Sequence, residues 1–476
     1  SVIAGYCFAY RKKTLRSLYL LAVSLFFYYK SGGLFFLLLV FITLIDYVCG
    51  LLIHRSHVRV ARRLFLVLSV VSNLGILAWF KYAGFVTETV NNILGTGFHT
   101  FDYLAAMSNT LLGTKFDIDS IILPVGISFF TFQSLSYTID VYRNRIEPVR
   151  NIIDFGFFVS FFPQLVAGPI VRASEFIPQL HAGFHLSRRE YGHALFLICK
   201  GLVKKIIISD FIAVNFIDRV FDAPLLYSGF ENLMAVYGYG LQIYCDFSGY
   251  TDIAIGLGLV FGFRFPVNFN SPYKAHGIAD FWKRWHISLS RWLKDYLYIP
   301  LGGNRKGLLR TCINLLVTML LGGLWHGASI MFVIWGGLHG LALVATRLWK
   351  QFAGNMFSRS VFGKYAGIII TFNFVNFCWL FFRSHDTASV SIMLGQIFSD
   401  FSPGSVIPVI KAYSPVFILI TAGYILHFLP EKLKETYRGA FINTPLVLQF
   451  TAVLIIASFL YQMRAADIMP FIYFRF

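Results

Sequence analysis

Charged residues are scarce in this sequence, and the common motifs of soluble enzymes are missing from it. Only 13% of the 476 residues are charged, whereas 57% are hydrophobic, which is more apolar surface than one soluble core can bury. The sequence contains no G-x-S-x-G elbow, no Walker P-loop, no Rossmann G-x-G-x-x-G and no H-E-x-x-H. Interpretations as a hydrolase, an ATPase, a dehydrogenase or a zinc protease therefore lack a supporting motif.

Cysteine is also rare, and its placement argues against disulfide and metal chemistry. The six cysteines lie scattered in apolar segments, without a C-x-x-C pair or a Cys/His cluster. We interpret them as small buried hydrophobic residues and expect no metal site. A cleavable signal peptide is not expected either, because residues 1–10 lack a charged n-region. That segment resembles the end of an apolar run, so we expect the biological chain to begin some residues earlier.

Basic residues outnumber acidic ones, 41 to 23, and give a formal net charge of +18. Most of the lysines and arginines lie between apolar runs, where the positive-inside bias and anionic lipid headgroups account for them. No RNP-like or zinc-finger spacing accompanies these residues. We therefore expect membrane lipid as a partner and do not expect nucleic acid.

The apolar runs have the length that a membrane-spanning helix needs, which is about 20 residues. The run at 311–349 is long enough for two passes. The expected fold class is therefore all-α, with a single polytopic membrane domain over 1–476 and about 11 transmembrane helices. The runs lie at 14–30, 34–53, 64–80, 119–141, 190–216, 233–262, 311–349, 361–382, 406–428 and 444–462.

Clusters of basic residues set the expected orientation of the chain. One precedes the run at 14–30, a second follows the run at 34–53, and a third follows two further passes. All of them thus fall on one side of the membrane, which the positive-inside rule makes the cytoplasm. The stretch 87–120 between them carries Lys115 as its only basic residue. The clusters are Arg11, Lys12, Lys13 and Arg16; Arg55, Arg59, Arg62 and Arg63; and Arg143, Arg145 and Arg150.

The run at 157–171 is interrupted by Pro163, Gly168 and Pro169. Irregular backbone at membrane depth is stable only where protein or a water-filled cavity covers it. Two alternatives stay open, a re-entrant or buried segment and a kinked transmembrane helix, since spanning helices tolerate Pro and Gly.

Residues 279–299 alternate aromatic and basic positions with a helical period. At 100° per residue, one face is apolar and the other is charged, which predicts an amphipathic helix at the cytoplasmic interface. The apolar face consists of Trp282, Trp285, Leu289, Trp292, Leu293 and Tyr296, and the charged face of Lys283, Arg284, Arg291, Lys294 and Asp295.

His286 falls on the apolar side of that predicted helix, one turn from Trp282 and from Ser290. A histidine in such a place is either a hydrogen-bonded core residue or a functional group. The pattern of the helix alone does not decide between these two interpretations.

His326 lies inside an apolar span and is followed by Gly327 and Ala328, whose small size leaves room for a substrate chain. An ionisable side chain within a membrane span is a functional candidate, and a neutral imidazole can act as a general base. His339 lies 13 residues further on, about 140° from His326 on a helical wheel. We expect His339 to be a packing residue.

Asp246 and Asp252 lie in an otherwise apolar run, YCDFSGYTD, together with Ser248 and Gly249. A buried carboxylate needs a partner. The two aspartates could form a structural lock with Arg or Lys, or they could orient a catalytic histidine and hold it in one tautomer.

Several segments, in this order along the chain, resemble the membrane-bound O-acyltransferase family. WHISLSRW followed by LWHG is the most specific pair of motifs among them. The segments are LPVGISFFTFQSLSYTIDVYRN at 123–144, FFPQLVAGPIVR at 161–172, YCDFSGYTDIAIG at 244–256, DFWKRWHISLSRWLKDYLYIPLGGNRKG at 280–307 and LLGGLWHGA at 320–328. They define a motif-bearing core at 123–328.

The resemblance implies a ring of helices around a central channel, in which His326 is the principal catalytic residue and His286 the second. Re-entrant and interfacial helices would complete the ring. The residues expected to line the channel for donor and substrate are Asp246, Ser248, Gly249, Asp252, Trp285, Ser290, Trp325 and Gly327. A basic rim for docking the donor is expected at Lys283, Arg284, Lys294, Arg305 and Lys306.

The resemblance also implies the reaction. An acyl group, most simply acetyl, would pass from a cytoplasmic thioester, acetyl-CoA or an acylated carrier protein, to a polysaccharide such as alginate outside a bacterial inner membrane. No bound cofactor is expected, and a separate extracytoplasmic acyltransferase would complete the transfer. PLGGNRKG at 300–307 resembles the alginate branch of the family more than the branch that transfers D-alanine to teichoic acid. The alternative from another class is a proton-coupled transporter or polysaccharide export channel with His and Asp relays.

Overall fold

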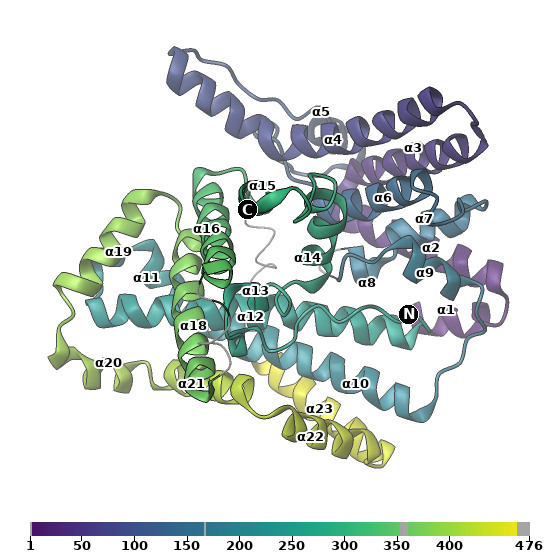
Figure 1. The fold of residues 1–476 in the computed structure, drawn as a ribbon. Coiled ribbons are helices and arrows are strands. Elements are labelled where there is room, and N and C mark those ends of the chain that lie inside the picture. Colours follow the sequence, from purple (N-terminus) through teal and green to yellow (C-terminus); the bar gives the residue numbers. More distant parts are fainter. Residues whose placement is uncertain (1, 166–167, 353, 355–359, 464–476) are drawn as a thin grey trace. The chain divides into compact units, whose positions relative to one another are not determined.

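The regular structure of the chain is helical. The computed structural model describes residues 2–165, 168–352, 354 and 360–463, and no strand occurs in this described part. The all-α class expected from the sequence is confirmed. Figure 1 shows the course of the helices.

The helices group into two compact units. Unit 1 comprises Ser1–Ser187 and Leu257–Pro266, and unit 2 comprises Arg188–Gly256 and Val267–Phe476. The motif-bearing segment at 123–328 contributes helices to both units. All of the site residues expected from the sequence belong to unit 2.

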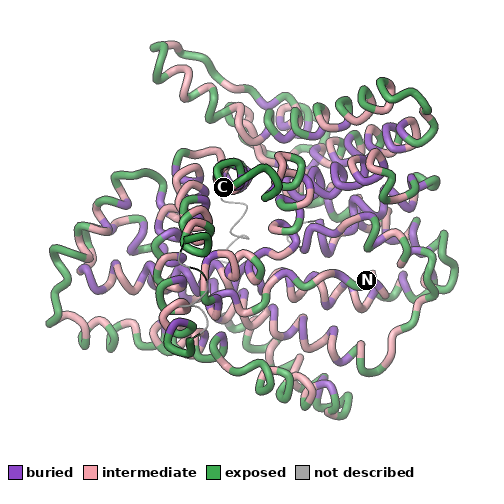
Figure 2. Tube along the Cα trace, viewed as in Figure 1, coloured by how far each residue is buried: buried purple, intermediate pink, exposed green. Residues whose placement is uncertain are grey.

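Unit 1 contains the first helices of the chain. In order these are α1 (Val2–Ala9), α2 (Lys13–Gly32), η1 (Gly33–Phe35), α3 (Phe36–Arg55), α4 (Arg59–Leu94), α5 (Tyr103–Leu112), α6 (Ile127–Tyr142), α7 (Ile152–Ser160), α8 (Phe162–Leu165) and α9 (Ala173–Leu180). Figure 2 shows that α6 is buried along nearly its whole length, whereas α4 exposes most of its surface. The exposed part of α4 is largely apolar, as suits a helix that faces lipid.

Unit 2 contains the remaining helices, several of which are short or π-helical. In order these are α10 (Arg188–Leu202), η2 (Val203–Asp210), η3 (Ala213–Ile217), α11 (Asp218–Asp222), η4 (Pro224–Leu226), α12 (Gly229–Val260, of which the last turn belongs to unit 1), η5 (Pro272–Lys274), α13 (Ile278–Phe281), α14 (Ile287–Leu293), η6 (Lys294–Tyr298), α15 (Gly307–His326), α16 (Ile330–Phe352), α18 (Val361–Arg383), α19 (Thr387–Ser399), η7 (Pro403–Ser405), α20 (Val406–Ala412), α21 (Ser414–Phe428), α22 (Glu431–Asn443) and α23 (Leu446–Met463).

The chain is a multi-pass membrane protein. Within its described residues, five helical stretches are long and apolar enough to cross a membrane, or up to seven if each of two bent helix pairs is one span. One stretch, Lys13–Arg55, has 43 residues, about twice the length that one crossing needs. Helices α15 and α16 confirm the two passes expected from the run at 311–349.

The expected number of about 11 spans is not confirmed, because several apolar runs do not form one long straight helix. The run at 119–141 is helical only from Ile127 onward. The run at 190–216 passes from α10 into the π-helical turns of η2 and η3. The run at 406–428 bends by 92° between α20 and α21.

The interrupted run at 157–171 is not a continuous helix. Helix α7 ends at Ser160 and the four-residue α8 follows it, while the described residues of 168–172 have no helical backbone. The segment is buried, and the buried Gln164 donates from Nε2 to the carbonyl oxygen of Phe158 at 2.7 Å. This agrees with the expected buried segment, of which residues 166–167 lie outside the described part.

A buried carboxylate joins three helices of unit 1. Asp46 of α3 has no exposed surface and accepts hydrogen bonds from Ser69 Oγ at 2.5 Å and Asn73 Nδ2 at 2.8 Å, both from α4. Ser134 Oγ of α6 donates to the same carboxylate. All of these donors are neutral side chains, so hydrogen bonding alone compensates for the burial of the acid.

We predict that Asp46→Ala lowers the unfolding temperature of the purified protein in detergent. The substitution leaves the buried groups of Ser69, Asn73 and Ser134 without their acceptor, and each such loss costs about 1–3 kcal/mol in soluble proteins. In membranes single hydrogen bonds average about 0.6 kcal/mol, so a fall of a few degrees is expected. Ser69→Ala, which removes one donor and keeps the acid, should cost less. An Asp46→Ala protein as stable as the wild type would contradict this role.

Candidate active site

The segment at 279–299 does not form the single amphipathic helix expected from its periodicity. It consists of α13, a turn, the short helix α14 and the π-helical η6. His286 caps α14 with left-handed backbone angles, φ 42° and ψ 56°, which no residue inside a helix adopts. The predicted helix is therefore wrong at its centre.

The physical reason is a competing set of backbone hydrogen bonds. The N–H of Asn270 donates to the carbonyl oxygen of Arg284, and the N–H of Ile287 donates to that of Asn268, both at 2.9 Å. The extended segment around Asn268 thus binds backbone groups that a continuous helix would use internally. The aromatic and basic residues of the segment are therefore divided between α13 and α14, with a turn between the two helices.

His286 is nevertheless fully buried, as its place on the apolar side suggested. Its ring contacts Phe247 edge to face, with ring centroids 4.7 Å apart. Burial lowers the pKa of the His286 imidazole to about 3, because a charged ring would lose its hydration. His286 is therefore neutral at physiological pH.

Asn268 determines which nitrogen of His286 carries the proton. The Oδ1 atom of Asn268 accepts from the backbone N–H of Ser288 at 3.0 Å and from Ser288 Oγ at 2.9 Å, which fixes the orientation of the amide. His286 Nδ1 lies 3.3 Å from the same oxygen, so Nδ1 must be the donor. The lone pair of the neutral ring is then on Nε2.

His326 is the last residue of α15, and the chain reverses after it into α16. The two helices pack closely: a Cβ atom on Gly323 would collide with the carbonyl oxygen of Phe332, and one on Gly336 with that of Met319. Glycine is required at these two crossing points. The close crossing places the ring of His326 5.0 Å from that of Trp335 in α16.

The two histidines predicted to be catalytic, His286 and His326, both contact the indole ring of Trp325. The ring centroid of Trp325 is 4.9 Å from that of His326 and 6.1 Å from that of His286. All three residues are at least 95% buried. Residues 40 positions apart in the sequence thus meet in one aromatic environment.

The space beside His326 is already partly filled. A Cβ atom on Gly327 would collide with the ring of Phe332, and the ring of Phe382 lies 5.5 Å from that of His326. The small residue after His326 therefore allows an aromatic ring to pack against the chain, where we expected it to leave room for a substrate.

His339 belongs to the same aromatic cluster, contrary to the wheel argument that separated it from His326. That argument assumed one helix, whereas α15 and α16 are two. The ring of His339 lies 4.8 Å from that of Trp335 and 5.2 Å from that of Trp282. His339 is fully buried, and neither ring nitrogen has a hydrogen-bond partner in the described part of the chain. A packing role alone leaves these two nitrogens unexplained.

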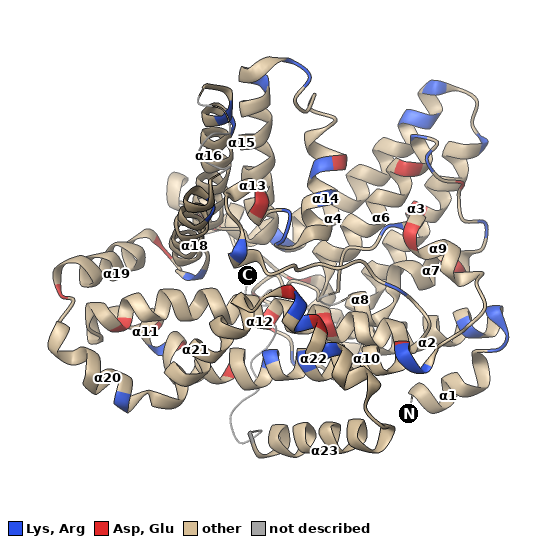
Figure 3. Cartoon of the chain, turned by 60° about the horizontal axis from the view of Figure 1, so that its bottom comes forward, with Lys and Arg blue, Asp and Glu red and all other residues tan. Residues whose placement is uncertain are grey.

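Asp246 and Asp252 form ion pairs with lysines, which is the structural alternative considered for them. Asp252 binds Lys200 at 3.0 Å and Lys204 at 2.8 Å, and Asp246 binds Lys205 at 2.5 Å. Figure 3 shows acidic and basic residues gathered where α10 and α12 lie near each other.

Ser248 and Gly249 belong to the same helix contact. Ser248 Oγ accepts a hydrogen bond from Lys204 Nζ at 3.0 Å. A Cβ atom on Gly249 would lie 2.8 Å from the carbonyl oxygen of Gly201, so glycine at this position allows α10 and α12 to approach.

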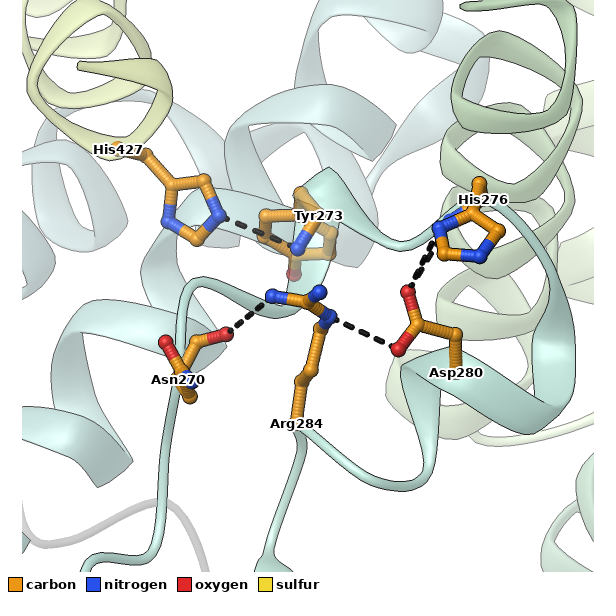
Figure 4. Close-up of polar contacts among 6 residues, drawn as sticks. All are labelled: Asn270, Tyr273, His276, Asp280, Arg284 and His427. Carbon is orange, nitrogen blue, oxygen red and sulfur yellow. Dashed lines mark hydrogen bonds and ion pairs between the residues drawn. The ribbon is translucent and has the colours of Figure 1, made fainter. Parts of the chain in front are cut away.

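The expected basic rim is exposed, with one exception. Lys283, Lys294, Arg305 and Lys306 are exposed. Arg284 is half-buried: its Nε pairs with Asp280 at 3.0 Å, and its Nη1 donates to the carbonyl oxygen of Asn270 at 3.4 Å (Figure 4). Arg284 therefore stabilises the turn before His286.

Trp285 and Ser290, which were expected to line the channel, have partners within the protein. Trp285 is buried among aromatic rings, with Trp379 at 4.9 Å and Phe269 at 5.1 Å. Ser290 Oγ donates to the carbonyl oxygen of Trp285 at 3.4 Å. Both residues support the turn that positions His286.

Sequence reasoning missed Asn268, which positions His286. A signal was present in PVNFNSPY at 266–273, where two asparagines lie between prolines directly before the aromatic segment. Such a polar, proline-bounded stretch is typical of extended backbone that pairs with a neighbouring segment.

Comparison with known proteins identifies the family of the chain. Residues 142–390 match the sequence model of the membrane-bound O-acyltransferase family. A peptidoglycan O-acetyltransferase of Helicobacter pylori is 39% identical over 417 residues, covering 82% of this chain and 75% of that protein. A probable alginate O-acetylase AlgI of Pseudomonas aeruginosa is 40% identical over 386 residues, covering 81% of this chain and 70% of that protein. 

A teichoic acid D-alanyltransferase of Bacillus subtilis is more distant, at 28% identity over 280 residues, covering 54% of this chain and 68% of that protein. The chain belongs to the membrane-bound O-acyltransferase family. It is a multi-pass membrane enzyme that transfers acyl groups to oxygen.

We predict that Asn268→Ala lowers kcat for acyl transfer at least about tenfold. Without the Asn268 amide, His286 loses the acceptor that fixes its tautomer. Because Asn268 acts through His286, the substitution should have little further effect in a His286→Ala background. Asn270→Ala is the matched control, since Asn270 is exposed and its described hydrogen bonds use only backbone atoms. Equal effects of Asn268→Ala in both backgrounds would contradict this coupling.

Proposed function

We propose that the enzyme moves an acetyl group from a cytoplasmic thioester across a bacterial inner membrane, for the O-acetylation of a polysaccharide outside. The observation that carries this proposal is the meeting of His286 and His326 on Trp325 in a buried, aromatic environment. The names of the two relatives near 40% identity, which both describe O-acetyl transfer, support acetyl as the group.

In the proposed reaction, His326 acts as the general base. It takes the proton of the acceptor hydroxyl while that oxygen attacks the thioester carbonyl carbon. The carbon–sulfur bond breaks, the thiolate takes a proton from the imidazolium, and the products are an ester and a free thiol. No oxidant, reductant or bound cofactor is required by this balance.

His286 has the second role in the proposal. It is neutral and has its lone pair on Nε2, so it can accept a hydrogen bond or a proton. The indole of Trp325 lies against both imidazoles and so places them in one aromatic environment. We propose that His286 orients the hydroxyl or thiol partner of the transfer.

The proposed donor is acetyl-CoA or an acylated carrier protein. Both carry phosphate, and the exposed Lys283 and Lys294 offer positive charge in the same stretch of chain as His286, while Arg305 and Lys306 lie at the start of α15. The orientation expected from the basic clusters places the donor side in the cytoplasm.

The final acceptor, reached through a partner protein, is proposed to be a cell-surface polysaccharide. Relatives of similar identity are named for peptidoglycan and for alginate, so both polymers are candidates. D-alanyl transfer to teichoic acid is less well supported, because that relative is 28% identical and covers 54% of the chain. The family assignment removes the support for a transporter.

A partner protein completes the proposed pathway. A polysaccharide acceptor needs an extended groove with many hydrogen bonds to sugar hydroxyls, which the short connections between membrane helices can hardly supply. We propose that a separate periplasmic acyltransferase receives the acyl group and delivers it to the polymer.

We predict that His326→Ala abolishes acyl transfer with near-normal expression and membrane insertion. The substitution removes the base and introduces no polar group into the buried site. His286→Ala should also lower activity, to a smaller extent. His385→Ala is the control, because His385 is exposed and lies outside the aromatic cluster. Substantial thioester-dependent transfer by the folded His326→Ala protein would refute the catalytic assignment.

We also predict that the enzyme alone does not acetylate a polymer efficiently. In the test, liposomes contain the purified enzyme, with acetyl-CoA or acetylated carrier protein inside and alginate or peptidoglycan outside. Polymer acetylation should depend on adding a periplasmic acyltransferase of the same bacterium. Efficient acetylation without the added protein would rule out the relay.

A further inference from the structure

Four lysines of unit 2 gather around one end of α21. Lys200 and Lys204 share Asp252, as described above, while Lys434 Nζ donates to the carbonyl oxygen of His427 at 2.7 Å and to Ser271 Oγ at 3.0 Å. Lys274 Nζ donates to the carbonyl oxygen of Leu429 at 2.5 Å. We call Lys200, Lys204, Lys274 and Lys434 the lysine cluster.

The buried ring of His427 connects the members of the lysine cluster. Lys204 Nζ lies 5.1 Å from the ring centre of Tyr244, and that ring meets the His427 ring at 4.6 Å. Lys204, Lys274 and Lys434 all act electrostatically on His427, and Lys200 acts on Lys434. Four separate elements, α10, η2, η5 and α22, thus direct positive charge to one place.

Acidic side chains balance only part of this charge. Asp252 is shared by two of the lysines, and the exposed Glu431 acts on Lys274 and Lys434. Arg284 and Arg438 also act on Lys274 and Lys200 respectively, but each of these arginines pairs with a carboxylate of its own, Asp280 and Glu435. Like charges held close together in a partly buried place repel, and a bound anion removes that repulsion.

Hydrogen-bond donors remain available in the lysine cluster. Each ammonium group has three N–H bonds, and the described contacts of Lys434 and of Lys204 use two each. One described contact uses the ammonium group of Lys274. Several donors can therefore bind one further acceptor.

The His427 ring is hydrogen-bonded to the segment that carries Lys274. Its Nε2 accepts the backbone N–H of Tyr273 at 3.1 Å (Figure 4), and the backbone of Ser271 also hydrogen-bonds to the ring. The ring is buried, at 3% exposed. His427 therefore fixes the segment of Lys274 against the end of α21, where Lys434 binds the carbonyl oxygen of His427.

We propose that the lysine cluster is a binding site for a phosphate group. Several lysine ammonium groups with unused N–H bonds suit the multiple oxygens and the negative charge of phosphate. Two sources carry this chemistry: the soluble thioester donor and an anionic lipid headgroup. The donor as a source rests on the function proposed above, whereas the phosphate site itself does not.

The test measures unfolding temperature in a phosphate-free maltoside detergent, with inorganic pyrophosphate, coenzyme A or phosphatidylglycerol added separately. At least one of these probes should raise the unfolding temperature in a saturable way. Lys434→Gln should weaken the binding of that probe at least about tenfold. Lys432→Gln is the matched control, because Lys432 is exposed on the same helix and outside the lysine cluster. Lys274→Gln repeats the test if Lys434→Gln does not fold.

The outcomes distinguish the thioester donor from a lipid as the source of the phosphate. They also distinguish a failure of the phosphate site from a failure of the proposed acyl transfer. Stabilisation by pyrophosphate and coenzyme A indicates the donor, and stabilisation by phosphatidylglycerol alone indicates a lipid. His326→Ala should bind the probe like the wild type, so a failure of acyl transfer leaves this measurement unaffected. The phosphate site is overturned if no probe raises the unfolding temperature. It is also overturned if Lys434→Gln and Lys432→Gln weaken binding of the probe equally.

Discussion

The active-site arrangement depends on the pairing of a short extended segment with a turn. Backbone hydrogen bonds from Asn270 and Ile287 join residues 268–270 to residues 284–287 and hold His286 in a left-handed conformation. An l-amino acid with a side chain adopts that conformation at a cost of about 1 kcal/mol or more, so surrounding contacts must maintain it. The Asn268 amide does so while also orienting the imidazole. One small motif thus sets the position and the tautomer of a candidate catalytic group.

The helical membrane fold and part of the candidate site could be predicted from the sequence. The apolar runs predicted a helical membrane protein, and the two passes at 311–349 are present as α15 and α16. The family resemblance of two short motifs pointed to His286 and His326, and the structure brings both to Trp325. The motif at 320–328 was informative because Trp325, the neighbour of His326, contacts both histidines.

Other features could not be predicted because they depend on contacts between distant residues. The periodicity at 279–299 is a local signal, and the hydrogen bonds that break the helix come from residues some 15 positions earlier. The wheel placed His339 away from His326 because it ignored the reversal after α15. The partners of Asp246 and Asp252 come from α10 and η2, 41 to 52 residues earlier in the chain, and no local pattern marks them.

The carboxylate of Asp46 has a consequence for how the chain enters the membrane. A lone aspartate at the centre of an inserting helix opposes insertion by about 2.5–3.5 kcal/mol. Its donors Ser69 and Asn73 lie in α4, the next helix to be synthesised, and Ser134 follows in α6. Helix α3 therefore gains its compensation only when α4 enters beside it, so the two helices favour insertion as a hairpin. The order of the helices along the chain therefore affects the free energy of membrane insertion. Helix α6 adds the hydrogen bond from Ser134 to Asp46 after α3 and α4 are in place.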